Sequence, residues 1–133
     1  MSTTSSDPAL SGYVPGTCNI GPAERQTRRR AGIFSSISAV VLFTVLIATG
    51  AAKPWRLLLF LPVAGAAAGF LQDRMHFCAG YGFRGVANVF SPVGETEDVT
   101  SAEFRKQDQQ KALQITGLSV AAGVVVTALA LLV

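Results

Sequence analysis

Three long apolar segments dominate the pattern of hydrophobic and polar positions along this chain: residues 33–52, 55–71 and 115–133. Arg56 is the only charged residue in the three segments together. A helix of about 20 mostly apolar residues crosses the ~30 Å hydrocarbon core of a bilayer, and about 17 is the lower end of that range. The pattern therefore predicts an all-α membrane protein with three transmembrane helices.

The first two segments form a predicted helical hairpin, because only Lys53 and Pro54 separate them and each backbone polar group in lipid needs an internal partner. Pro22 suits the first position of a helix and Glu24 its first turn, so the first helix is expected to run from near Pro22 to about Ala52. Thr100 and Glu103 match a capping box. They predict that the third helix begins well before its apolar segment and has a length of about 33 residues, or ~50 Å.

The connector at 72–114 joins the hairpin to the third apolar segment. Its part from Gln72 to Phe90 mixes aromatic residues with glycines, which is too apolar for a free loop and too interrupted for a span. We expect an interfacial or re-entrant segment here, with Tyr81 and Phe83 at the depth of the lipid headgroups. Residues 1–17 have the composition of a disordered tail. The remainder, 18–133, forms a single three-helix transmembrane domain.

Composition supports this class of protein. Half of the 133 residues are hydrophobic and 14% are charged, against about 25% charged in a soluble domain. The formal net charge is +3, and an arginine cluster stands directly before the first apolar segment. Its position favours anionic lipid headgroups as partners and gives no support to nucleic acid. The predicted headgroup ligands are Arg25, Arg28, Arg29 and Arg30.

The distribution of basic residues predicts the orientation, since cytoplasmic loops carry an excess of Lys and Arg. The hairpin joint has Lys53 and Arg56. Four arginines precede the first segment, and five basic residues lie in the connector: Arg74, Arg84, Arg105, Lys106 and Lys111. We therefore expect a multi-pass protein of a bacterial-type inner membrane, with its N-terminus and the 72–114 connector in the cytoplasm and its C-terminus outside. A cleaved signal peptide is the alternative for the first segment, disfavoured by its long polar leader and long apolar run.

Small residues recur at helical spacing inside two of the segments. Gly65 and Gly69 form a GxxxG motif, and Ser119, Gly123 and Thr127 repeat the four-residue spacing in the third segment. Small residues four apart allow helix backbones to approach closely in a membrane. We interpret both sets as helix-packing faces; the alternative is that Gly and Ala are simply common in such helices.

Few residues suggest chemistry. Cys18, His76 and Cys78 could supply ligands to a metal, but the spacing typical of structural zinc sites is missing. The stretch from Gly80 to Gly85 matches GxGxxG, yet it follows a transmembrane segment instead of the strand that a dinucleotide site requires. No catalytic residues and no cofactor are predicted.

The motif around the first helix start resembles a known family. Asn19-Ile20-Gly21-x-x-Glu24-Arg25-x-x-Arg28-x-x-x-Gly32, followed by a hydrophobic hairpin, is similar to the opening of the YgaP-like transmembrane domain family, which has NVG-x-x-DR-x-x-R-x-x-x-G. The likeness covers about Asn19 to Leu71. Glu24 stands where the family has Asp, and the connector and third segment have no counterpart. Some family members are joined to a rhodanese domain, which this chain lacks, so the resemblance implies a cytoplasmic N-terminus and a packing role.

These observations lead to one functional expectation and two alternatives. We expect a small non-catalytic membrane protein that acts as an accessory or assembly subunit of a larger membrane complex, such as a respiratory or photosynthetic one. One alternative is a metal- or thiol-handling membrane protein that uses Cys18, His76 and Cys78. The other is a protein that binds anionic lipids through its arginine cluster.

Overall fold

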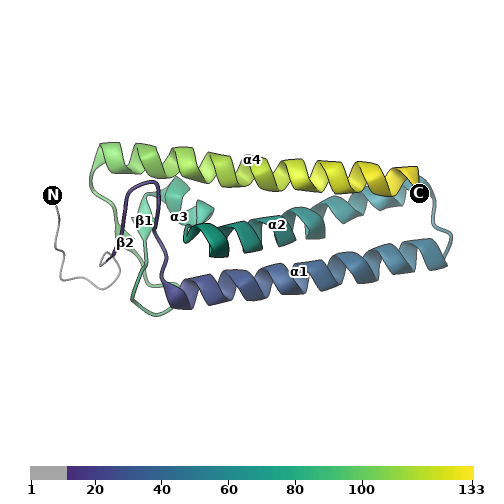
Figure 1. Cartoon of the computed structure of the whole chain (residues 1–133), viewed down its shortest axis with the longest axis horizontal. Coiled ribbons are helices and arrows are strands. Elements are labelled where there is room, and N and C mark those ends of the chain that lie inside the picture. The colour runs from purple at the N-terminus through teal and green to yellow at the C-terminus, as the bar shows by residue number, and fades with distance from the viewer. Residues whose placement is uncertain (1–11) are drawn as a thin grey trace.

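The computed structural model describes residues 12–133 and shows a bundle of long helices with a small folded head at one end (Figure 1). Its elements are α1 (Pro22–Ala48), the 3₁₀ helix η1 (Lys53–Leu59), α2 (Phe60–Met75), α3 (Ala79–Arg84), β1 (Val86–Ala87), β2 (Glu97–Asp98) and α4 (Ala102–Leu132). Three helices are long and apolar enough to cross a membrane: α1, η1 continued by α2, and α4. The prediction of an all-α membrane protein with three such helices is confirmed.

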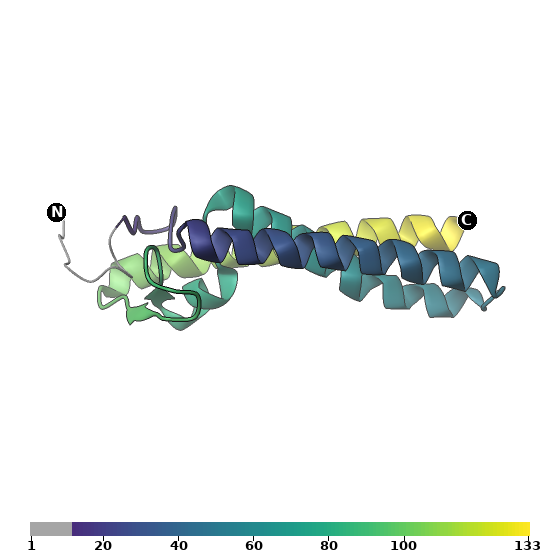
Figure 2. The ribbon, with the colours of Figure 1, turned by 90° about the horizontal axis from the view of Figure 1, so that it is seen from below.

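Helix α2 is the central helix of the bundle. It packs along α1 on one side and along α4 on the other, and Figure 1 shows it lying between them. The head, built from the N-terminal segment, α3 and the two short strands, lies at the end where α1 begins (Figure 2). The hairpin joint and the C-terminus lie together at the opposite end. The predicted placement of the N-terminus and the connector at one end of the spans therefore holds within the fold.

The helix boundaries differ from those expected. Helix α1 ends at Ala48 and not near Ala52, because the chain turns at Gly50, whose φ of +66° is easily adopted only by glycine. The second span starts as a 3₁₀ helix and extends beyond Leu71 to Met75. It ends where His76 adopts the left-handed conformation, with φ of 56°.

Close backbone approach joins α1 to α2. A Cβ atom built on Gly69 would lie 2.6 Å from the Gly32 nitrogen and 2.7 Å from the Arg28 carbonyl oxygen. Backbone atoms cannot move aside as a flexible side chain can, so this crossing requires a residue without a side chain. Gly65 is less constrained, because its nearest neighbour is the Ser35 hydroxyl at 3.2 Å.

The small residues of α4 face α2. Ser119, Gly123 and Thr127 are buried, and a Cβ on Gly123 would lie 2.8 Å from the Phe60 ring. The far end of α4 is held by Arg56, whose Nη1 donates to the carbonyl oxygens of Ala130 at 2.9 Å and Val133 at 3.0 Å. Arg56, which the sequence shows only as a charge at the hairpin joint, thus donates to carbonyl groups that the end of a helix leaves without partners.

The start of α4 also differs in detail from the expectation. Ser101, and not Thr100, is the N-cap residue, and its hydroxyl accepts a hydrogen bond from the Phe104 nitrogen at 3.3 Å. The helix then runs for 31 residues, close to the expected length.

The first part of the connector folds into a compact head at one end of the helices. Phe77 is fully buried beside Ala112 and Ile115 of α4, and α3 packs on α4 as well. Tyr81, expected at headgroup depth, is buried inside the head, while Phe83 is exposed. Strands β1 and β2 pair antiparallel and close the loop that follows α3.

The expectation of a disordered tail at 1–17 is corrected for its last residues. Tyr13 Oη donates to Asp108 Oδ2 at 2.6 Å, and the Gly16 nitrogen donates to Asp108 Oδ1 at 2.7 Å. Residues 12–17 therefore lie against α4, and the rest of that call lies outside the described residues.

Candidate functional site

A buried carboxylate, Glu24, is the centre of the head. Only 1% of its surface is exposed. Its Oε2 accepts hydrogen bonds from Tyr81 Oη at 2.6 Å, Asn88 Nδ2 at 2.9 Å and the Gly94 nitrogen at 2.9 Å. Its Oε1 forms an ion pair, without hydrogen-bond geometry, with Arg28 Nη1 at 3.3 Å. One side chain at the first turn of α1 thus fixes α3 and the loop that follows β1.

The sequence produces this arrangement because α1 begins at Pro22, which places Glu24 in the first turn with Arg28 one turn later. Residues four apart share a helix face. The carboxylate also lies at the positive end of the helix dipole, which favours its charged form. The remaining partners come from residues 57 to 70 positions away in the chain.

Asn19 makes a second buried contact within the head. Its Oδ1 accepts from the Cys78 nitrogen at 2.7 Å, and its Nδ2 donates to the Cys78 carbonyl oxygen at 3.1 Å. The Asn88 nitrogen donates to the Asn19 carbonyl oxygen at 2.9 Å. The side chain and backbone of one asparagine therefore join the segment before α1 to both the start of α3 and β1.

Gly21 completes this contact. The Gly21 nitrogen donates to the Asn88 carbonyl oxygen at 3.2 Å, and a Cβ atom at position 21 would overlap the Val89 carbonyl oxygen. Only glycine fits a backbone that passes so close to another. The motif residues Asn19, Gly21 and Glu24 are thus brought together as structural partners.

Three of the four arginines expected to bind lipid headgroups form ion pairs within the protein. Arg25 Nε lies 3.2 Å from Asp73 Oδ1, and Arg29 Nε lies 2.9 Å from Asp73 Oδ2. Arg28 pairs with Glu24, as described above. Asp73 thereby ties the end of α2 to the start of α1, and Arg30 alone of the four forms no such pair within residues 12–133.

The candidate metal ligands are not assembled. Cys18 and Cys78 are both free thiols. Cys18 Sγ donates to the Ile20 carbonyl oxygen at 3.4 Å, whereas Cys78 Sγ accepts from Arg28 Nη2 at 3.1 Å. His76 is exposed at the end of α2. Among residues 12–133, no group of three or more His, Cys, Asp or Glu side chains is arranged to hold a metal ion.

Burial shifts the acidity of head groups outside the spans. Burial, together with the hydrogen bond to Glu24, raises the pKa of Tyr81 to about 12. Burial is also the main cause that raises the pKa of Tyr13, with a further contribution from its hydrogen bond to Asp108. Burial raises the pKa of the Cys18 thiol above its usual value, which disfavours the thiolate that nucleophilic or metal-binding chemistry requires.

Stacked cations complete the network around Tyr81. The Arg28 guanidinium lies 5.6 Å from the centroid of the Tyr81 ring, and the Arg84 guanidinium lies 5.2 Å from it. Such contacts contribute about 0.5–2 kcal/mol, more when they are desolvated. The network as a whole holds the head to the bundle, and its polar groups form their hydrogen bonds and ion pairs mainly with one another.

The sequence predicts a place for Glu24 in the first helical turn and an interfacial position for Tyr81, but it does not predict the contacts of Asp73, Asn88 and Asp108. These three residues are buried, and their partners lie far away in the sequence. The available signal was that Asp73 and Asp108 are acids within two turns of an apolar segment, where a buried carboxylate needs a partner.

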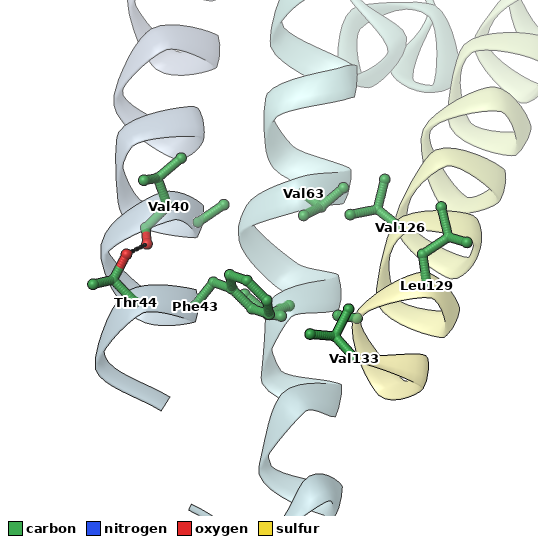
Figure 3. Close-up of a pocket in the computed structure, with 10 residues that line it drawn as sticks. Val40, Phe43, Thr44, Val63, Val126, Leu129 and Val133 are labelled. Atoms are coloured by element: carbon green, nitrogen blue, oxygen red, sulfur yellow. Dashed lines mark hydrogen bonds between the residues drawn. The ribbon is translucent and has the colours of Figure 1, made fainter. Parts of the chain in front are cut away.

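The membrane-spanning part carries one further feature, an apolar groove between α1 and α4. Its volume is about 360 Å³, and it opens near the end of the bundle opposite the head (Figure 3). The groove exists because α1 and α4 both rest on the second span, which forms its floor through Leu59 of η1 and Val63 of α2. Figure 3 shows Val40 and Phe43 of α1 on one side and Val126 and Leu129 of α4 on the other.

Comparisons with known proteins identify no relative. No family model matches the chain, no curated protein matches it, and no solved structure matches it. The class of protein that the fold defines is a helical membrane protein with three apolar helices and a head held by a buried carboxylate network.

Proposed function

We propose that this protein is a non-catalytic accessory or assembly subunit that docks laterally on a larger complex in a bacterial-type inner membrane. The groove between α1 and α4 carries the proposal. It is lined almost entirely by apolar side chains and lies within the spans, where a partner helix could insert its own side chains. The polar groups of the head meanwhile satisfy one another, which suits a structural role.

Filling the groove is a physically reasonable source of affinity. Helices in lipid associate mainly through van der Waals packing, since burying apolar surface gains little when the surroundings are already apolar. A groove leaves the atoms that line it without contacts on one side, and each new heavy-atom contact contributes about 0.1–0.2 kcal/mol. Side chains of a partner helix would supply many such contacts at once.

The orientation belongs to the same proposal. Nine of the 11 basic residues lie at the start of α1 or in the 72–114 connector, so the positive-inside rule favours a cytoplasmic head and N-terminus, with the hairpin joint and C-terminus outside. We also propose that residues 19–71 are related to the YgaP-like transmembrane domains. The joint role of Asn19, Gly21 and Glu24 in one contact supports this relationship.

The test fills the groove from α1 and compares the result with a neighbouring position. In Ala39→Phe the ring would occupy the groove, whereas in Val41→Phe it would face lipid, because Val41 is exposed and does not line the groove. Both variants are expressed in the native host, extracted in mild detergent and compared by native electrophoresis and mass spectrometry. We expect Ala39→Phe to lose its place in a larger assembly and Val41→Phe to keep it.

A second pair of variants, on α4, tests the groove independently in case Ala39→Phe fails to fold. Val126 lines the groove and Val125 does not, although both are exposed. Val126→Trp should reproduce the loss and Val125→Trp should not. Retention of the assembly by both groove variants, or a wild-type protein that migrates alone with lipid, would contradict a docking role for the groove.

A further inference from the structure

Free basic side chains are found on all three spans near the head. Each of Arg30 in α1, Arg74 in α2 and Lys111 in α4 has no ion pair or side-chain hydrogen bond within residues 12–133. Arg30 and Arg74 are exposed, and Lys111 is half-buried. We refer to these three residues as the basic ring.

The packing of the helices brings the basic ring to the head end of the bundle. Arg29 and Asp73 are joined at 2.9 Å, so their sequence neighbours Arg30 and Arg74 lie near this ion pair. Gly69 packs beside Arg28 and Gly32, and α2 runs opposite to α1, so Arg74 lies more than one turn nearer the head than Arg30. Met75 packs against the cluster that contains Ala112, which sets Lys111 beside the end of α2. Three helices thus each place one cation in a zone about two turns deep at the head end of the bundle.

That depth coincides with the edge of the apolar part of the bundle. From Lys111 to Leu132 there are 21 helical steps, or about 31 Å at 1.5 Å per residue. From Arg30 to Ala48 there are 18 steps, or about 27 Å. Both lengths match a hydrocarbon core of about 30 Å, so the basic ring lies where lipid phosphates would be.

The local charge balance is positive. Asp73 is the carboxylate at this level, and Arg25 and Arg29 already exceed its charge. Asp108, one turn above Lys111, is fully buried under Tyr13 and Gly16. The ring charges therefore have no acidic partner on the surface of these three helices at this depth.

We propose that the basic ring is a binding surface for anionic phospholipids of the leaflet on the head side, with Arg30, Arg74 and Lys111 each contacting a headgroup phosphate. Arginine and lysine near a membrane surface attract anionic lipid by about 1 kcal/mol each, which corresponds to about fivefold in affinity per charge. This site replaces the Arg25, Arg28 and Arg29 set, whose guanidinium groups are held by Asp73 and Glu24. It is separate from the groove, so either proposal can fail alone.

The experiment measures lipid retained by the purified full-length protein. Wild type in detergent is mixed with equal amounts of phosphatidylglycerol and phosphatidylcholine, and native mass spectrometry counts the bound lipids of each kind. We expect a preference for phosphatidylglycerol in wild type and its reduction by at least tenfold in the triple variant Arg30→Gln, Arg74→Gln, Lys111→Gln.

The matched control removes the same charge elsewhere. The variant Lys53→Gln, Arg105→Gln, Lys106→Gln changes one exposed cation at the hairpin joint and two near the start of α4, and it should keep the preference. A ring variant in which Lys replaces Arg30 and Arg74, and Arg replaces Lys111, should keep it too, which separates charge from folding. An unchanged preference in the glutamine ring variant, an equal loss in the control, or displacement of the lipid by millimolar inorganic phosphate would each overturn the proposal.

Discussion

Replacing Glu24 with Gln tests the buried carboxylate network most directly. The substitution keeps the shape of the side chain but removes its charge and replaces one oxygen with an amide nitrogen. In the wild-type head, one oxygen faces three donors and the other faces the Arg28 guanidinium. Whichever way the new amide is oriented, its NH₂ group meets a donor, and Arg28 loses its charged partner.

The magnitude follows from the number of bonds. Hydrogen bonds to a charged acceptor contribute about 1.5–3 kcal/mol, and neutral ones about 0.5–1.5 kcal/mol, so three weakened bonds correspond to about 3 kcal/mol. Breaking a buried ion pair by removing one partner costs a similar amount, about 3–5 kcal/mol. We therefore expect the head of Glu24→Gln to be less stable against local opening by about 3 kcal/mol.

Hydrogen exchange with mass spectrometry is the suitable assay, since the Asn88 and Gly94 amides are both hydrogen-bonded inside the head. A loss of about 3 kcal/mol raises the exchange rate by roughly a hundredfold when the head opens and closes faster than the exposed amides exchange. Peptides from residues 86–94 should show this acceleration, and those from residues 36–48 of α1 should not. Glu103→Gln is the control, because Glu103 is an exposed acid in the first turn of α4. Exchange of residues 86–94 at the wild-type rate in Glu24→Gln would refute a stabilising role for the carboxylate.

Three further predictions concern packing, acidity and orientation. Gly69→Ala should lower the midpoint of thermal unfolding in detergent, because the new Cβ would meet backbone atoms of α1. Gly65→Ala should leave the midpoint unchanged or raise it. Equal effects of the two substitutions would mean that α1 and α2 cross less closely than described. The Tyr81 pKa of about 12 is raised above its unfolded value of about 10, so the stabilising contribution of this neutral phenol is present below pH ~10 and is lost as the pH rises toward ~12. Absorbance at 295 nm should show ionisation of Tyr81 near pH 12 in wild type and at lower pH in Glu24→Gln. Ionisation near pH 10 in wild type would contradict burial of this side chain. A reporter that is active only outside the cytoplasm should work when fused after Val133, and one that is active only inside should work when inserted at Glu95; the opposite pattern would reverse the proposed orientation.

The spans were predictable because length and composition alone determine whether a helix can cross a bilayer. Their ends were harder to predict, since they depend on local conformations. The turn at Gly50 ends α1 four residues early, and the left-handed His76 ends α2 four residues late. Neither residue differs in hydropathy from its surroundings in a way that marks a boundary.

The head could not be predicted from the local pattern because its stabilising contacts join residues far apart in the sequence. Glu24 meets Asn88 across 64 positions, and Tyr13 meets Asp108 across 95. The arginine cluster was assigned to lipid for the same reason. Asp73, the partner of Arg25 and Arg29, lies at the end of another helix, and the sequence does not show that the two helix ends meet.

The three buried acids also set an order in which the protein can assemble during synthesis. The pair formed by Asp73 needs only residues up to the end of α2, so the α1–α2 hairpin can close while the rest of the chain is still being made. Glu24 has only Arg28 as a partner until the chain reaches Tyr81, and its other donors follow at Asn88 and Gly94. Asp108 fixes the N-terminal segment last, after α4 has begun. A nascent chain arrested before Tyr81 would thus hold a closed hairpin with a carboxylate that lacks its hydrogen-bond donors, a state in which the head is still open to chaperones and proteases.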